Sequence, residues 1–130
     1  MSVDGIDSHK EWQEKELTRM VRGGVLFPML SDPGGALGRL YGVYNKDSGT
    51  NRRGHFLIDP DGIIQAQEIL PDPVGRNVKE ILRQLRALQH YRNTGKYIPC
   101  GWYPGRPTLE AKTEKSTHWP SEEWKTRHAF

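Results

Sequence analysis

The 130-residue sequence has almost no cysteine, because Cys100 is the only one. A single thiol can form neither an intramolecular disulfide nor a cysteine-only metal site, so any redox role needs a second thiol on another molecule. Without further context, a lone cysteine is more often an inert side chain than a reactive one. The scarcity of cysteine also fits a reducing compartment, and we expect the protein to be cytoplasmic.

Long apolar segments are missing as well. No run approaches the ~18 residues that a membrane-spanning helix needs. The first residues, MSVDGIDSHKEW, have neither the cationic start nor the apolar centre of a signal peptide. Hydrophobic residues make up 35% of the chain and the mean hydropathy is -0.77, which is low for a compact globule. We therefore predict no membrane partner, and we expect part of the chain to be an exposed tail or to pack on something else.

Metal and nucleotide motifs are absent too. The five histidines and the cysteine never approach zinc-ligand spacing, and the glycine pairs lack the Lys-Ser or Lys-Thr that follows a phosphate loop. We predict no cofactor and no metal. The net charge of +3 comes from 19 basic residues interspersed with 16 acidic ones. This mixture favours a solvated face over a nucleic-acid site for the basic positions Arg83, Arg86 and Arg92, so no nucleic-acid partner is predicted.

Glycine and proline divide the first third of the chain into short elements. Residues 1–4 are predicted to be a strand stub. Asp7 or Ser8 can then cap a helix that stops at the glycine pair 23–24. The short apolar run 26–30 is predicted to be a strand interrupted by a proline. A one-domain chain of this length has enough material for one modest core.

The remaining elements have clearer signals. A helix is expected over 33–41, because proline suits a first helical turn. Strands over 55–59 and 63–69 flank Pro60-Asp61-Gly62, where proline presets the turn and glycine can take the left-handed position, so this segment predicts a β-hairpin. Asn77, with a glutamate three residues later, starts the most secure helix. Its apolar residues repeat along one face: Val78, Ile81, Leu82, Leu85 and Leu88.

Beyond residue 91 the helical pattern stops, and scattered prolines predict an extended tail held by Trp102. The order of strands and helices predicts an α/β or α+β fold with a mixed sheet. Within it, Arg53 stands directly before an apolar strand, where a fixed guanidinium can hold a thiolate or a peroxide oxygen. The alternative is an ordinary surface arginine beside Arg52, and spacing alone favours that alternative.

Five segments, taken together in order and spacing, resemble the second half of a peroxiredoxin of the alkyl hydroperoxide reductase C and thiol-specific antioxidant family. The segments are SVDGIDSHKEW, FPMLSD, LYGVYNKDSGTNRRGHFLIDPDGII, PDPVGRNVKEILRQLRALQ and IPCGWYPGRPTL. RGHFLIDPDGII followed by PVGRNVKEIL is the most specific combination. The resemblance implies a thioredoxin-like fold that is truncated at its N-terminus, with a partial domain over 1–92 and the C-terminal tail of the family over 93–130.

The resemblance also implies an activity. Peroxiredoxins reduce hydrogen peroxide and organic hydroperoxides with a cysteine thiolate and need no bound cofactor. The implied partners are the peroxide substrate and a thiol reductant such as thioredoxin or a dedicated reductase, and the complete protein is expected to form homodimers or rings of dimers. Arg53, in RRGHF, corresponds to the arginine that lowers the pKa of the catalytic cysteine and orients the peroxide, and Arg76, in PVGRN, to a second arginine near that site. A fixed cation stabilises the thiolate and then the charge that develops as the O–O bond breaks.

Two departures from the family pattern matter. The peroxidatic cysteine of the family lies in a Pro-x-x-x-Thr-x-x-Cys loop upstream of the SVD strand, and this sequence begins at that strand. The chain alone is therefore expected to be inactive, and a non-catalytic thioredoxin-like interaction or oligomerisation module is the alternative. An upstream stop, from a frameshift or from a selenocysteine codon at the peroxidatic position, would explain a start at Met1.

The second departure concerns Cys100. The resolving cysteine of two-cysteine members corresponds to Ile98, so Cys100 stands two residues late. A resolving role for Cys100 is therefore a hypothesis that the position on the tail permits, and it does not follow residue by residue from the resemblance.

Overall fold

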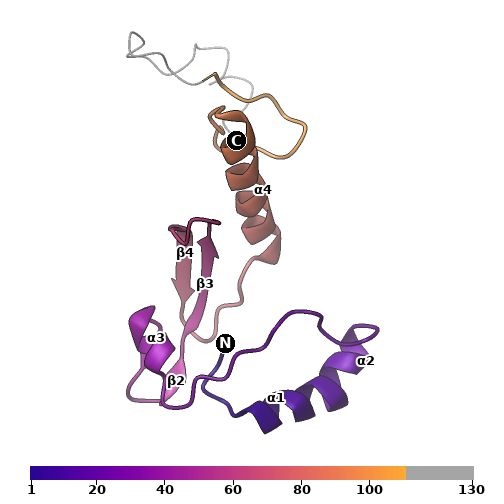
Figure 1. Ribbon diagram of the computed structural model, residues 1–130, viewed down its shortest axis with the longest axis vertical. Coiled ribbons are helices and arrows are strands. Elements are labelled where there is room, and N and C mark those ends of the chain that lie inside the picture. Colours follow the sequence, from indigo (N-terminus) through magenta and orange to yellow (C-terminus); the bar gives the residue numbers. More distant parts are fainter. Residues whose placement is uncertain (111–130) are drawn as a thin grey trace. The chain divides into compact units, whose positions relative to one another are not determined.

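The computed structural model describes residues 1–110, so the final part of the predicted tail, 111–130, lies outside the described residues. The chain divides into two compact units, Met1–Arg76 and Asn77–Phe130. The first unit contains short helices and the predicted hairpin, and the second contains the long helix and the start of the tail (Figure 1). The boundary predicted at residue 92 is not tested by this division and stays a prediction.

The first helix is a continuous stretch of three segments: α1 (Ile6–Trp12), the π-helical η1 (Gln13–Leu17) and α2 (Thr18–Met20). Its N-cap is Gly5 and no side chain caps it, so the predicted capping role of Asp7 or Ser8 is wrong. Because the helix begins at least two residues earlier than expected, Asp7 falls in the first turn, where a negative charge suits the positive end of the helix dipole. Leu17 is the buried residue of the stretch.

The two predicted N-terminal strands reduce to a single bridge in the described residues. Ser2 pairs in parallel with Ser31. The Ser2 amide donates to the Leu30 carbonyl at 3.1 Å, and the Asp32 amide donates to the Ser2 carbonyl at 2.8 Å. Pro28 lacks an amide proton and so cannot extend the ladder backwards along the second segment.

Helix α3 (Ala36–Leu40) begins later than predicted. Gly34 and Gly35 precede it with positive φ angles of 79° and 69°, so a turn occupies the positions expected to be helical. The buried carboxylate of Asp32 reaches across this turn and accepts hydrogen bonds from the amides of Leu37 (3.1 Å) and Gly38 (2.8 Å). The bond from Gly38 is the main cause that lowers the pKa of Asp32.

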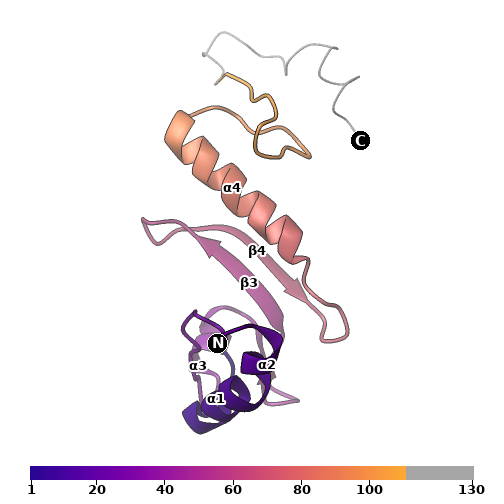
Figure 2. The same ribbon diagram turned by 90° about the vertical axis from the view of Figure 1, so that its right-hand side faces the viewer.

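Two antiparallel hairpins follow. The small one pairs β1 (Tyr44–Asn45) with β2 (Thr50–Asn51) and was not predicted from the sequence. The larger one, β3 (Arg53–Ile58) with β4 (Ile64–Leu70), confirms the predicted hairpin, and Figures 1 and 2 show its strands side by side. Its turn uses Gly62 at a φ of 81°, as predicted.

The second unit contains helix α4 (Val78–Thr94). The Asn77 side chain accepts a hydrogen bond from the Glu80 amide at 3.2 Å, which confirms the predicted N-cap. The helix ends at Gly95, a left-handed C-cap, a few residues beyond the end of the apolar pattern. The tail then returns, and Tyr97 pairs with Leu109 through two backbone hydrogen bonds of 2.8 and 3.0 Å.

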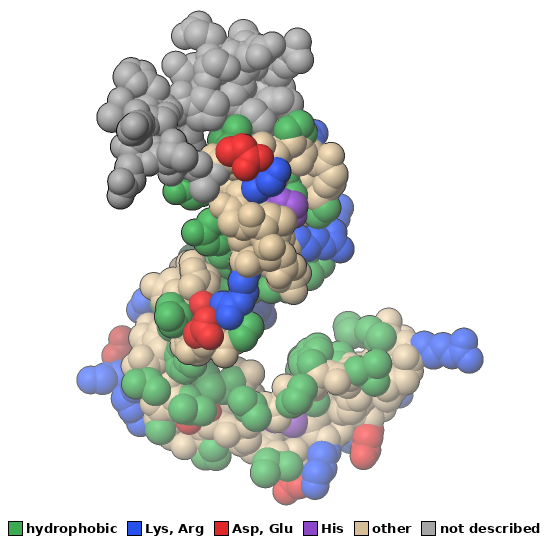
Figure 3. All heavy atoms as spheres, turned by 45° about the horizontal axis from the view of Figure 1, so that its top comes forward, with side chains coloured by type: hydrophobic (Ala, Val, Ile, Leu, Met, Phe, Trp, Pro, Cys, Tyr) green, Lys and Arg blue, Asp and Glu red, His purple; other side chains and the backbone are tan. Residues whose placement is uncertain are grey.

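Few apolar side chains in the described residues are buried: Leu17, Val43 and Trp102 are the hydrophobic residues that are less than a tenth exposed. In the first unit, by contrast, Leu26 is 96% exposed and Leu40 78% exposed. Figure 3 shows hydrophobic side chains gathered at the molecular surface. Unpacked apolar surface of this kind agrees with the expectation that part of the chain packs on something else.

Within residues 1–110, the helices are all too short or too polar to cross a lipid bilayer.

Candidate active site

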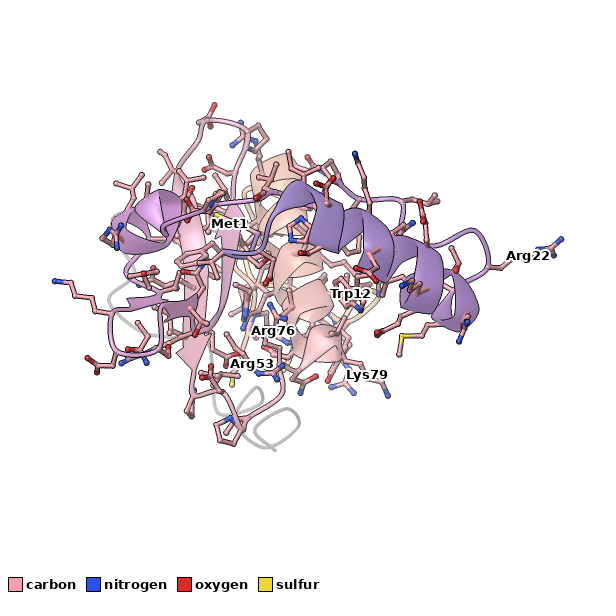
Figure 4. All side chains as sticks on the ribbon, turned by 90° about the horizontal axis from the view of Figure 1, so that it is seen from below. Met1, Trp12, Arg22, Arg53, Arg76 and Lys79 are labelled. Atoms are coloured by element: carbon pink, nitrogen blue, oxygen red, sulfur yellow. The ribbon has the colours of Figure 1, made fainter. Side chains whose placement is uncertain are left out.

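The two arginines singled out in the sequence lie together in the first unit. Arg53 is the first residue of β3, and its Nε donates a hydrogen bond to the Asp72 carbonyl at 2.7 Å. The Nη1 of Arg76 donates to the carbonyl of Gly54, the residue after Arg53, at 3.3 Å. Figure 4 labels both side chains and shows them close to one another. The structure therefore brings together the two residues that the family resemblance paired.

The local fold explains why Arg53 and Arg76 lie close together. In the hairpin, Arg53 is paired with Leu70, so the chain that leaves β4 passes the Arg53 side chain at once. A turn closed by the Val74 amide on the Pro71 carbonyl (2.9 Å) then redirects the chain and returns Arg76 to the beginning of β3. The two arginine bonds are reciprocal, because each crosses between β3 and the segment after β4. They fasten that segment to the strand.

Gly54, the residue after Arg53, allows β3 to approach Val43 closely. A Cβ atom on Gly54 would lie 2.7 Å from Cγ1 of the buried Val43, a separation that real Cβ atoms essentially never show. A side chain here would push β3 away from the segment that precedes it. The glycine beside Arg53 is thus a packing requirement that the sequence pattern did not reveal.

The charge of the pair is open to a ligand. Each arginine uses one donor on a backbone carbonyl, and within residues 1–110 neither forms an ion pair with a carboxylate. A guanidinium carries several N–H donors in a planar fork, so donors remain on both residues. Two exposed, fixed guanidinium groups of this kind can bind an anion or the oxygen atoms of a peroxide and can stabilise developing negative charge.

A shallow hollow of about 460 Å³ lies beside the pair. Its lining includes Arg52 and Asp72, the residue whose carbonyl holds Arg53, and an apolar wall from the end of β4. The sequence analysis assigned no separate surroundings to Arg52. The alternation of side chains along an extended strand was the signal that the two residues face different surroundings.

A second neighbour of Arg53 was also missed. His55 lies on the same face of β3, two residues further along, and its Nδ1 is 3.6 Å from Oε2 of Glu68 on the paired strand. The His55 side chain is 13% exposed, and neither of its ring nitrogens has a hydrogen-bond partner in the described part of the chain. The period of two along a strand would have found this residue.

Cys100 belongs to the second unit, whereas both arginines belong to the first. It is a free thiol and exposed. No group of three or more potential metal ligands occurs among residues 1–110.

Comparison with known proteins identifies the family of this chain. The sequence model of the AhpC/TSA family matches residues 1–67, and that of the C-terminal domain of 1-Cys peroxiredoxin matches residues 87–119. The chain belongs to the peroxiredoxin family. The family match thus confirms the resemblance on which the two arginines were chosen.

Among curated proteins, the chain is 50% identical over 132 residues to the selenocysteine-containing peroxiredoxin PrxU of Peptoclostridium acidaminophilum, an alignment that covers 100% of this chain and 64% of that protein. It is 36% identical over 110 residues to the alkyl hydroperoxide reductase C of Ferdinandcohnia aciditolerans, with coverage of 84% and 64%. This peroxiredoxin chain therefore spans less than two thirds of the length of these relatives.

Solved structures agree with the fold. The reduced 2-Cys peroxiredoxin of Plasmodium vivax matches with a TM-score of 0.73 and 33% identity over 82% of this chain and 55% of that one. AhpC of Enterococcus faecalis matches with a TM-score of 0.67 and 36% identity over 75% of this chain and 57% of that one. The predicted thioredoxin-like fold is confirmed.

Proposed function

We propose that this chain is the arginine-bearing part of a peroxidase that reduces hydrogen peroxide and organic hydroperoxides in its complete form. The observation that carries the proposal is the pairing of Arg53 and Arg76, two guanidinium groups fixed by backbone carbonyls and, within residues 1–110, without carboxylate partners. The family membership supports the same activity. The catalytic nucleophile comes from outside these 130 residues, since Cys100 does not match its motif.

The arginines have a defined chemical task in this reaction. A thiolate or selenolate attacks one peroxide oxygen, the O–O bond breaks, and the other oxygen leaves as alkoxide or hydroxide and takes up a proton. The nucleophile becomes a sulfenic or selenenic acid, so it supplies the two electrons that reduce the peroxide. Negative charge moves from the nucleophile to the leaving oxygen, and fixed donors beside both positions stabilise it throughout.

The nucleophile is a cysteine or a selenocysteine. Support for the second alternative comes from PrxU, the relative that is 50% identical to this chain and is named for its selenocysteine. Both residues serve the same two-electron chemistry, and Arg53 and Arg76 would hold the peroxide in either case.

Cys100 is proposed as the resolving thiol. Its thiolate would attack the sulfenic or selenenic acid and release water, and the resulting disulfide or selenylsulfide would be reduced by two electrons from thioredoxin or a dedicated reductase. The exposure of the thiol supports this role. The protein would act in the cytoplasm as a homodimer or a ring of dimers, the assemblies expected for the complete form.

A fused protein tests the peroxidase proposal. The 130-residue chain is compared with the same chain joined to the preceding segment of PrxU, with cysteine in place of its selenocysteine. We expect the fused protein to consume peroxide with a thiol reductant, and the chain alone to react no faster than free cysteine. Peroxide consumption by the chain alone well above that rate, lost on Cys100→Ser, would overturn the proposal.

The large exposed side chains of the first unit support one further candidate, a non-catalytic interaction or oligomerisation module. Light scattering and thermal melting of the chain alone test it. A sharply melting dimer would support the module, and a monomer without cooperative melting would exclude it.

A further inference from the structure

The tail around Cys100 is fastened to helix α4. Trp102 is only 4% exposed, and its ring lies 5.2 Å from the His90 ring of the helix, at 44°. Its Nε1 donates a hydrogen bond to the Arg106 carbonyl at 2.9 Å, so the polar atom of this buried indole is satisfied. The tail in this region therefore has a defined place on the helix surface.

Arg83 connects the helix to the tail through its backbone. Its Nε and Nη2 bind the two carboxylate oxygens of Glu80, each at 2.7 Å, and its Nη1 donates to the Trp102 carbonyl at 3.1 Å. Gln84 adds a hydrogen bond of 3.0 Å to Oε1 of Glu80. The bidentate pair orients the guanidinium plane, so that the remaining edge points at the tail carbonyl. We refer to Glu80, Arg83 and Trp102 as the clasp.

Cys100 lies in a tight turn that ends at the clasp. The Trp102 amide donates to the Pro99 carbonyl at 3.2 Å and closes the turn around Cys100 and Gly101. Gly101 has a φ of 65°, the conformation that glycine supplies at the third position of such a turn. Pro99 and Trp102 are buried, and Cys100 is exposed. The thiol thus projects from a turn of which both ends are packed.

We propose that Arg83 is a positioning residue for Cys100. Through its hydrogen bond to the Trp102 carbonyl, Arg83 determines where the tail presents the Cys100 thiol. Arg83 has no covalent or proton-transfer role. The effect of Arg83 on turnover rests on the proposed function of Cys100 as resolving thiol. The existence of the clasp does not depend on that function.

Amide hydrogen exchange on the full chain tests the clasp. In Arg83→Ala and Arg83→Lys we expect the Trp102 amide to exchange about tenfold faster, as for the loss of one charge-assisted hydrogen bond. The Val43 amide, which donates to the Gly38 carbonyl in the first unit, is the reference and stays unchanged. Arg86→Ala is the matched control, because Arg86 is an exposed arginine of the same helix, and it leaves both amides unchanged.

A charge-swapped variant separates positioning from simple helix stabilisation. Glu80→Arg combined with Arg83→Glu keeps an ion pair on the helix, but a carboxylate at position 83 cannot donate to the Trp102 carbonyl. Rapid exchange of the Trp102 amide in this double variant supports the proposal. Restored protection in the double variant, no change in Arg83→Ala, or equal acceleration at Val43 would each overturn it.

The fused peroxidase tests the consequence for Cys100. After one equivalent of peroxide, the disulfide of Cys100 should form about tenfold more slowly in Arg83→Ala than in the parent, and at the parent rate in Arg86→Ala. An unchanged rate in Arg83→Ala overturns the positioning role. Absence of any Cys100 disulfide in the parent overturns the resolving role under the proposed function, and the exchange experiment still decides the clasp.

Discussion

At the scale of single residues, Arg53 and Arg76 owe their suitability as ligands to what holds them. Carboxylate partners would neutralise them, whereas backbone carbonyls orient each guanidinium and leave its charge available. Arg52 has a different environment, at the edge of the neighbouring hollow. Arginines that are adjacent in the sequence therefore have different surroundings.

Substitution of Arg53 should show whether the two arginines also have different roles. In the fused peroxidase, we expect Arg53→Ala to lower kcat/KM for hydrogen peroxide by about a hundredfold or more, the usual loss for one fixed donor to developing charge. Arg52→Ala is the matched control and should change kcat/KM by less than about twofold. Steady-state peroxide assays measure both variants. Equal losses in the two would show that only general positive charge matters.

The packing requirement at Gly54 can be tested by measuring the stability of a variant. We expect Gly54→Ala to lower the free energy of unfolding by about 1–3 kcal/mol, because its Cβ would overlap Val43. Gly75→Ala is the control, since a Cβ there meets nothing within 4 Å. Urea unfolding of the three proteins measures the difference. A neutral Gly54→Ala would mean that β3 can shift away at no cost.

The ionisation of Glu80 should make the clasp sensitive to acid. The hydrogen bond from Arg83 is the main cause that lowers the pKa of Glu80 from 4.5 to about 2. A lowered folded-state pKa gives stability that is fully present above pH 4.5 and is lost as the pH falls towards 2. The stability difference between the parent and Glu80→Gln should therefore be constant near neutral pH and shrink across that acidic window. A difference that does not vary with pH would contradict this assignment.

At the scale of elements, helix α4 shows how a local signal becomes structure. Its Asn77 cap and its apolar period were both readable in the sequence, since capping and helical spacing depend on neighbouring residues alone. The hydrogen bond from Arg83 to the Trp102 carbonyl could not be predicted from the sequence, because the two residues are 19 positions apart and no local rule relates them.

The N-cap of α4 gives a prediction at this scale. We expect Asn77→Ala to destabilise the second unit by about 1 kcal/mol through the loss of the bond to the Glu80 amide. Asn93→Ala, an exposed asparagine in the last turn of the same helix, should be close to neutral. Circular dichroism during urea unfolding compares the two. Equal effects would mean that helix propensity, and not capping, determines the loss.

The first helix and α3 show where local signals failed. Asp7 and Ser8 were good caps by residue type, yet Gly5 takes the position. At α3, two glycines with positive φ delay the helix, and Asp32 caps it from across the turn. In both cases the backbone conformation, and not the residue types that favour caps, determined where the helix begins.

At the scale of the whole molecule, the chain is a partial peroxiredoxin of two compact units. The described part of each unit leaves large apolar side chains uncovered, such as Leu26 in the first unit and Val78 in the second.

The sequence by itself determined the family, the hairpin, the long helix and the choice of Arg53 and Arg76 as candidate site residues, because these depend on short motifs and on local propensities. Only the tertiary structure decided how Arg53 and Arg76 are held, why Gly54 must be small, and how Arg83 fastens the turn of Cys100 to the helix. These features depend on contacts between residues far apart in the chain, and on backbone carbonyls that every residue possesses and no sequence pattern distinguishes.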